Sequence, residues 1–500
     1  MVFNPEIPIG DLISFSRGGG WGKDEPFDGA IEVAIIRGAD FPAIEMGNYC
    51  DLPIRYEKET KVKSVALRAG DIVLENSGGT DTRPTGRTLL ISEKLLSEYS
   101  CPVIPASFCR VVRFDNSVDC EFIYFWLQEM FNAGRTWGYQ NRSTGLANFQ
   151  FKTFSQMELV PSLPLDEQQK IGALLSVIDQ KRIANNRLNG YLAELAQTIY
   201  NDWFRDFGHW GGQMPSHWET GVLGDYVTIK RGGSPRPIQE YLSDEGLRWL
   251  KIADVSGISG PYILEIKEHI KEEGLRKTVH LEPGSLVLSN SATPGIPKIL
   301  SIDTCIHDGW LYFPQSQFTN EWLYCYFLNV RQELIRMANG SVFQNLKTDI
   351  VKNFEVIRPD DETLASFQEM VAPLFNLMES CQKENKQLAD LRDTLLPKLM
   401  SGEIDVSQVD LTQLNSHLVQ RVQIVSQSAV QPNLPSNLTD HPLVGNTLVS
   451  CSKPVLSIVE FRSVLHFMKV LDGLVKLPVE FLRGFLHRIK EDLVLIHPEQ

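Results

Sequence analysis

The chain contains two copies of one module, and this duplication limits the folds open to it. Three motifs of the first half recur at a single offset of 214 residues: Ile9-Gly10-Asp11 as Leu223-Gly224-Asp225, Arg17-Gly18-Gly19 as Arg231-Gly232-Gly233, and residues 70–77 as residues 284–291. A second register, with an offset of 196, relates residues 192–195 to residues 388–391. Solenoid units repeat every 20–50 residues or so. The longer period here predicts two copies of a domain followed by a helix, and so two similar binding surfaces on one chain.

Composition places the chain among ordinary globular proteins. Its 500 residues predict roughly three domains. With 43% hydrophobic and 22% charged residues, each module has enough apolar material for its own core. The eight cysteines are scattered without a C-x-x-C pair, which favours reduced thiols and a cytoplasmic location over a disulfide framework or a zinc site.

Targeting signals and strong positive charge are both missing from the sequence. The first ten residues lack a basic stretch followed by an apolar one, so no signal peptide is expected. No run of about 18 apolar residues predicts a membrane span. The net charge of −14 argues against bulk, nonspecific binding of nucleic acid by the chain alone. A local basic surface for phosphate remains compatible with that total.

The two globular modules are predicted at residues 1–163 and 215–360. In the first, strands are expected at 65–67, 71–74 and 109–114, and a helix at 121–130. Polar loops rich in Gly, Arg, Asn, Gln, Ser and Thr occur in both modules, at 75–87, 132–148, 231–237, 289–298 and 338–347. Such loops offer hydrogen-bonding side chains on a backbone that can approach a ligand closely. The alternative is that they are solvated connections.

A long helix is predicted after each module, at 164–206 and 361–406. Apolar residues recur every seven positions in both segments, which is the pattern of a coiled-coil seam. Each helix of about 38 residues would be about 57 Å long. The other copy is the expected partner, with Asn185 fixing the register; the alternative is that each helix packs only on its own module. The predicted seam residues are Ile171, Ile178, Asn185, Leu188, Leu192, Leu195, Ile199, Phe367, Leu374, Leu377, Leu388, Leu391 and Leu395.

The end of the chain has no counterpart in the first half. Residues 407–452 are rich in Gln, Ser, Asn and Pro, and predict a flexible linker. Residues 453–500 predict a helical tail with two short amphipathic helices on either side of Pro478. This tail either folds back on the rest of the chain or contacts a partner protein.

Motifs for catalysis are not found. The sequence lacks a P-loop, a G-x-G-x-x-G after a strand, H-E-x-x-H, G-x-S-x-G and the Asn-Pro-Pro-aromatic motif of amino-methyltransferases. The ten histidines are dispersed, and none pairs with a plausible nucleophile or metal cluster. We therefore predict no catalytic residue and no metal ligand in this chain.

The helical segments carry a family resemblance. The run Pro164-Leu165-Asp166-Glu167-Gln168-Gln169-Lys170-Ile171, followed by Ile178-Asp179, resembles the central conserved region of specificity subunits of type I restriction-modification systems. Residues 391–404 (LRDTLLPKLMSGEI) resemble their C-terminal conserved region. The Gly-Asp openings and the G-D-I-V-L turn are typical of their target recognition domains. The resemblance covers about residues 5–406.

The resemblance implies an α+β fold with two target recognition domains in tandem, each followed by a long helix, the two helices pairing as an antiparallel coiled coil. Each domain would read one half of a bipartite site in double-stranded DNA. The helices would dock two modification (methyltransferase) subunits, which carry S-adenosylmethionine, and the complex would include restriction subunits that use ATP and Mg. The chain itself would be non-catalytic and hold no cofactor. Two alternatives are a single-chain modifying or cleaving protein with its activity in the tail, and a scaffold that binds no DNA.

The polar loops supply the candidate base contacts. Arginine pairs with guanine, and Asn or Gln with adenine, through two hydrogen bonds in the major groove. Asn76 and Asn290 have an alternative role, capping a turn in both copies. The predicted DNA-binding residues are Asn76, Ser77, Thr80, Arg83, Arg87, Arg135, Gln140, Asn141 and Arg142 in the first module, and Arg231, Ser234, Arg236, Asn290, Ser291, Thr293, Lys298, Asn339 and Gln344 in the second.

Overall fold

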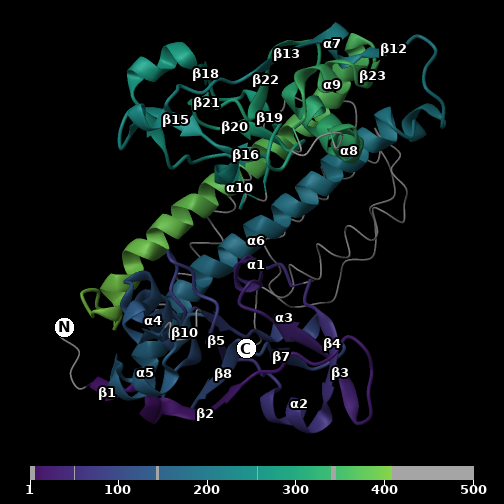
Figure 1. Cartoon of the computed structure of the whole chain (residues 1–500). Helices are drawn as coiled ribbons and strands as arrows, with labels where there is room; N and C mark the ends of the chain where they lie inside the picture. The colour runs from purple at the N-terminus through teal and green to yellow at the C-terminus, as the bar shows by residue number, and fades with distance from the viewer. Residues whose placement is uncertain are drawn as a thin grey trace, which may run out of the picture. The chain divides into compact units, whose positions relative to one another are not determined.

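The computed structural model describes residues 6–49, 51–141, 146–255, 257–258, 260–338 and 345–407. Its described residues form two compact units: unit 1 comprises those up to Asn186 together with Asn385 to Ser407, and unit 2 comprises Arg187–Glu384. Figure 1 labels their elements. The predicted tail, and the predicted linker beyond Ser407, lie outside the described residues. Within the described ranges, no helix is long and apolar enough to cross a membrane.

Unit 1 contains a four-stranded sheet in the order β2-β8-β5-β6, a three-stranded sheet in the order β4-β3-β7, and two two-stranded sheets, β1-β11 and β10-β9. Strand β3 pairs in parallel with β7. The last four residues of β3 are buried, as expected for a strand covered on both faces. The strands are β1 (Glu6–Pro8), β2 (Ile13–Gly18), β3 (Ala30–Ile36), β4 (Ile54–Lys58), β5 (Ile72–Glu75), β6 (Thr88–Leu90), β7 (Val103–Pro105), β8 (Cys109–Phe114), β9 (Gln140–Asn141), β10 (Asn148–Phe149) and β11 (Leu159–Pro161).

The helices of unit 1 cover these sheets. Helix α4 begins after Asp119, whose carboxylate accepts a hydrogen bond from the Phe122 N–H at 2.9 Å. The helices are η1 (Ile9–Leu12), α1 (Phe41–Glu45), α2 (Glu59–Val65), α3 (Glu93–Ser97), α4 (Cys120–Asn132), η2 (Arg135–Tyr139) and α5 (Phe151–Met157). The strand predicted at 65–67 is wrong, because Val65 ends α2. There Val62 and Val65 are both buried at the i, i+3 spacing of a helix.

Unit 2 repeats this arrangement with additional strands. Its main sheet has the order β13-β22-β19-β20-β16, and a second sheet has the order β14-β17-β15-β21-β18. Strand β15 pairs in parallel with β21, as β3 does with β7. The strands are β12 (Glu219–Val222), β13 (Val227–Arg231), β14 (Leu242–Ser243), β15 (Leu247–Leu250), β16 (Tyr262–Ile263), β17 (His269–Ile270), β18 (Val279–Leu281), β19 (Leu286–Ser289), β20 (Pro297–Leu300), β21 (Thr304–Ile306), β22 (Trp310–Ser316) and β23 (Glu355–Arg358), the last pairing with β12.

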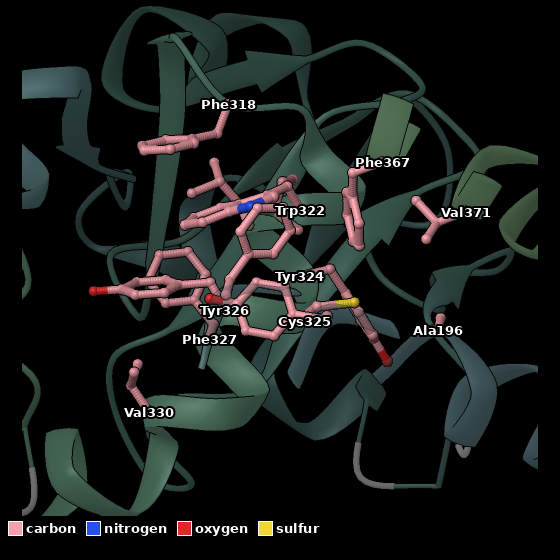
Figure 2. Packing of buried hydrophobic residues seen from close by; sticks show 14 of the residues in the cluster. Ala196, Phe318, Trp322, Tyr324, Cys325, Tyr326, Phe327, Val330, Phe367 and Val371 are labelled. Atoms are coloured by element: carbon pink, nitrogen blue, oxygen red, sulfur yellow. The ribbon is translucent and has the colours of Figure 1, made fainter. Parts of the chain in front are cut away.

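Aromatic side chains fill the core of unit 2. The Trp322 ring stacks on Phe318 with centroids 4.1 Å apart and lies 5.3 Å from Tyr326. Figure 2 shows this packing with Ala196 of α6 and Phe367 of α10. Apart from α6 and α10, the helices of unit 2 are η3 (Gly208–Trp210), α7 (Leu223–Tyr226), η4 (Ile238–Glu240), η5 (Ile252–Val255), η6 (Glu272–Lys277), α8 (Asn320–Ala338) and α9 (Thr348–Lys352).

Helices α6 (Leu165–Phe204) and α10 (Asp361–Met400) have 40 residues each, close to the predicted 38 or so. In unit 1, Asn185 is 2% exposed and its amide donates to Asn385 at 2.9 Å, while Asp179 accepts from Arg392 at 3.1 Å. A residue earlier in α6 thus contacts a residue later in α10, so the two segments run in opposite directions. Ile171 of α6 shares one core with Leu396, Leu399 and Met400 of α10.

The other predicted seam residues of α6 and α10 include several in unit 2. Leu192, Leu195 and Ile199 share one core with Phe367 and Leu374, and with sheet residues such as Leu286 and Ile299. The alternative that each helix packs only on its own module is therefore wrong, because the end of α6 packs with the second module. Ile178 and Leu388 are 5% and 9% exposed, Leu188, Leu377 and Leu395 are partly buried, and Leu391 is 47% exposed.

Candidate nucleic-acid interface

The two predicted polar loops of unit 1 come together. The Phe149 N–H donates to the Asn76 carbonyl at 2.7 Å, and the Gly78 N–H donates to the Ala147 carbonyl at 3.3 Å. The Ser77 hydroxyl donates to Asn148. Because these bonds link residues about 70 positions apart, the loops form one polar surface at the ends of β5 and β10.

A buried carboxylate organises the arginines of this surface. Glu75 is 3% exposed and accepts from Arg83 at 2.8 Å and from Arg87 at 2.9 and 3.0 Å. Arg83 and Arg87 also donate to the carbonyls of Gly78 and Gly38. Two guanidinium groups share one carboxylate, so the cluster keeps one net positive charge. The arginines are 32% and 18% exposed and are held in fixed directions.

The other candidates of unit 1 have different surroundings. The Gln140 side chain accepts from the Thr85 N–H at 2.9 Å, and the Thr80 hydroxyl accepts from the Arg83 N–H at 3.0 Å, so both brace the 75–87 loop. Arg135 donates to Glu158 and its guanidinium lies 4.9 Å from the Trp126 ring centroid. Asn141 is exposed and Asn76 is half-buried, while Arg142 lies outside the described residues.

In unit 2, Asp308 accepts hydrogen bonds from four of the predicted DNA-binding residues. Its side chain accepts from Ser234 at 2.7 Å and from Arg236 at 3.3 Å, and its backbone carbonyl accepts from Arg231 and from Asn290. Burial raises the pKa of the Asp308 carboxyl, but the Ser234 hydrogen bond and the nearby Arg231 charge outweigh it. The pKa of Asp308 therefore lies below its ordinary value, and the carboxylate stays ionised beside its arginines.

A hollow of about 640 Å³ adjoins this cluster. Its lining includes Ser234, Arg236, Lys251, His307 and the ring of Trp249, which is 1% exposed. Burial lowers the pKa of the His307 imidazole, so it is neutral at pH 7. The hollow thus combines an apolar wall with two cationic side chains at a polar rim.

The remaining candidates of unit 2 differ in access. Lys298 is 4% exposed and its ammonium donates to the carbonyls of Ile258 and Gly260, and burial lowers its pKa to about 8. A base contact by Lys298 would first have to break these bonds. Asn290 is 3% exposed. Thr293 is exposed and Ser291 is half-buried, while Asn339 and Gln344 lie outside the described residues.

One tight turn has the same backbone bonds in both units. We call residues 106–109 and 307–310 the shared turn. The Cys109 N–H donates to Ala106 at 2.8 Å, as Trp310 does to His307 at 3.1 Å. The N–H groups of Asn76 and Asn290 donate at 2.8 Å to the carbonyls of Phe108 and Gly309.

Two glycines determine how closely the shared turn packs on its sheet. A Cβ on Gly19 would lie 1.9 Å from the Pro105 carbonyl oxygen, and one on Gly232 would lie 2.3 Å from that of His307. The Gly19 N–H donates to the Cys109 carbonyl at 3.0 Å and the Gly232 N–H donates to the equivalent Trp310 carbonyl at 2.9 Å. Gly19 and Gly232 are therefore equivalent, which differs by one residue from the sequence match of Arg17 to Arg231. Each edge strand has an irregularity before this point, between Ile13 and Phe15 in β2 and between Thr228 and Lys230 in β13.

Sequence reasoning missed Phe108, His307 and Asp308. They lie on the shared turn, outside the Gly- and Arg-rich loops that were selected by composition. The duplication is the sequence feature that could have found them. Aligning the two copies through β8 and β22 pairs Phe108 with Gly309, so the difference between the copies at this position becomes visible. Among the described residues, no group of three or more His, Cys, Asp or Glu side chains is placed to hold a metal ion.

Two alike modules, each with a polar loop surface organised by a carboxylate, define a duplicated recognition protein. The family model described as "Type I restriction modification DNA specificity domain" matches the chain twice, over residues 7–193 and 215–391. The chain therefore belongs to this family of specificity subunits, and the predicted resemblance is confirmed. Specificity subunits have a non-catalytic role, in line with the prediction that the chain is not an enzyme.

Named relatives agree with this assignment. The type I restriction enzyme MjaIX specificity subunit of Methanocaldococcus jannaschii is 24% identical over 416 residues, covering 78% of this chain and 89% of that protein. The HindI specificity subunit of Haemophilus influenzae is 22% identical, covering 75% of this chain and 94% of that protein. The crystal structure of the S subunit of a type I restriction-modification system from M. genitalium has the same fold, with a TM-score of 0.51 at 16% identity, over 79% of this chain and 95% of that one.

Proposed function

We propose that this chain is the DNA-recognition subunit of a type I restriction-modification complex, and that each module reads one half of a bipartite site in double-stranded DNA. The observation that carries the proposal is the shared turn, which keeps one backbone in both units while its side chains differ. Such a pair presents two different sets of contacts on one scaffold. Arginines at the loop surfaces, with Arg83 held by Glu75 and Arg236 exposed beside Asp308, suit the bidentate readout of guanine in the major groove.

We further propose that α6 and α10 pair as an antiparallel coiled coil that sets the spacing of the half-sites. Forty residues of helix are about 60 Å long. Surfaces that face the same side of B-DNA must be separated by about 34–36 Å or a multiple of it. The buried Asn185–Asn385 bond supports this role, since a polar pair in an apolar seam favours one register.

Catalysis and cofactors belong to partner subunits in this proposal. Two modification subunits would dock on the helices and bring S-adenosylmethionine for adenine methylation, and restriction subunits would bring ATP and Mg-dependent activities. The chain's formal charge of −14 fits a subunit whose partners supply much of the positive surface around the DNA.

The test is methylome mapping in cells that carry this chain together with its modification subunit. We expect one bipartite motif with a constant gap, which disappears when the chain is omitted. Exchanging residues 1–163 for the first module of another family member should change one half-site only, and exchanging 215–360 should change the other. Methylation by the chain without a partner, or a change in both half-sites after one exchange, would contradict the proposal.

A further inference from the structure

The side chains on the shared turn differ in kind between the two units. Unit 1 carries Ala106-Ser107-Phe108, and unit 2 carries His307-Asp308-Gly309 at the same backbone positions. A residue that serves the fold alone would be similar in both copies, because the backbone bonds around it are the same. The difference therefore points to a role that differs between the copies.

In unit 1 the turn presents an aromatic ring to solvent. Phe108 is 57% exposed, while Ala106 and Cys109 on either side are 5% and 1% exposed. Its carbonyl accepts from the N–H groups of Asn76 and Ser77, at 2.8 and 3.1 Å, so the ring projects from a backbone that is fixed to the polar surface. An aromatic ring held this way contacts a ligand with little loss of conformational entropy.

In unit 2 the same position excludes a side chain. A Cβ on Gly309 would lie 2.0 Å from Cε1 of His307 and 2.8 Å from the Ser291 hydroxyl oxygen. The turn instead places Asp308 between two exposed arginines, with Arg236 at 3.3 Å and Arg231 at 3.9 Å. The Arg236 side chain is 79% exposed, so most of its donors remain free for a ligand.

We infer that the shared turn supports base reading in both units: Phe108 of the turn contacts the 5-methyl group of a thymine in the first half-site, and Arg236 of the 231–237 loop, oriented by Asp308 of the turn, reads a guanine in the second. This inference rests on the proposed function. The thymine methyl is the apolar group that base pairs present in the major groove, and it is the feature an uncharged ring can distinguish there. Guanine O6 and N7 are the acceptors that suit a guanidinium.

The first test uses the complete complex of this chain with its modification subunit, and duplexes in which each thymine of the first half-site is replaced by uracil in turn. Removing the methyl group at the thymine read by Phe108 should weaken binding about fourfold, the effect of one buried methyl-sized group. The F108A complex should bind thymine and uracil duplexes equally. An L159A complex, altered at an exposed leucine of β11, should discriminate like the wild type.

The second test places 7-deazaguanine, which lacks the N7 acceptor, at each guanine of the second half-site. Wild-type binding should fall at least about fivefold at one position, and the R236A complex should lose that discrimination. The R236K complex separates readout from charge, because lysine keeps the positive charge and loses the two-pronged donor. Discrimination that the R236A complex retains, with overall binding weakened, would overturn the guanine assignment in favour of a phosphate contact.

Failure of the inference is distinguishable from failure of the proposed function. A wild-type complex that selects no sequence refutes the proposed function. A wild-type complex that selects a bipartite site, yet accepts uracil at every thymine of the first half-site and 7-deazaguanine at every guanine of the second, refutes the inference alone.

Discussion

Replacing Glu75 with glutamine tests how the arginines of unit 1 are held. The carboxylate accepts three N–H donors, from Arg83 at 2.8 Å and from Arg87 at 2.9 and 3.0 Å. The amide loses one acceptor, and its two remaining bonds keep their charged donors but no longer have a charged acceptor. One hydrogen bond to a charged group contributes about 1.5–3 kcal/mol, and loss of the acceptor's charge weakens each remaining bond by about half of that. The sum is about 3–6 kcal/mol in a fully buried site.

Solvent reduces this loss, because the Arg83 and Arg87 side chains are 32% and 18% exposed and regain water as partner. We expect E75Q to destabilise unit 1 by about 2–3 kcal/mol, which lowers its unfolding temperature by about 4–12 °C. Calorimetry measures the transition, and hydrogen exchange of residues 72–90 locates it. The control E59Q removes an exposed pair with Lys63 and should change stability by less than about 0.5 kcal/mol. Equal behaviour of the two variants would refute the reasoning.

Three further changes test other parts of the structure. G19A should disrupt unit 1, because its Cβ would meet the Pro105 oxygen at 1.9 Å, whereas G18A meets nothing within 4 Å and should keep its circular-dichroism melting curve. Changing Asn185 and Asn385 together to leucine should raise the unfolding temperature, because a buried polar pair fixes the register at a cost in stability. The same change should weaken assembly with the modification subunit, measured by size-exclusion chromatography. A lower unfolding temperature would contradict a register role. Burial lowers the Lys298 pKa to about 8, so between pH 8 and about 10.5 the unfolded chain binds more protons at this residue than the folded chain does. The Lys298 contribution to the free energy of unfolding therefore rises with pH in this range. Urea titrations of K298M at several pH values should lack that rise.

The duplication and the long helices were predictable because both are periodic features of the sequence. Heptad spacing located α6 and α10 to within a few residues, and the β-rich run at 109–114 coincides with β8. The strand expected at 65–67 failed because β-branched residues also fit a helix when tertiary burial favours their i, i+3 spacing, as at Val62 and Val65.

The candidate site was predictable only in part. Composition selected the loops around Arg83, Arg87 and Arg236, but it gave no information on burial. Lys298 looks like a loop cation in sequence, yet it lies in β20 and its ammonium donates to the Ile258 backbone carbonyl. Phe108 was overlooked because an isolated phenylalanine between a strand and a turn normally indicates core. Its exposure depends on hydrogen bonds between segments that are distant in sequence, and no local pattern encodes those.

The composition of the two cores determines how recognition modules can be exchanged. Leu192, Leu195 and Ile199 of α6 belong to the core of unit 2, so replacing Leu192 and Leu195 by aspartate would unfold the second module along with the helical spacer. Likewise, Leu396, Leu399 and Met400 of α10 complete the core of unit 1. A module exchanged at residues 1–163 must therefore pack on residues 385–407 of its host. Chimeras that keep the contacts of these three apolar residues should fold, whereas those that change them should lose the first half-site through instability rather than through altered readout.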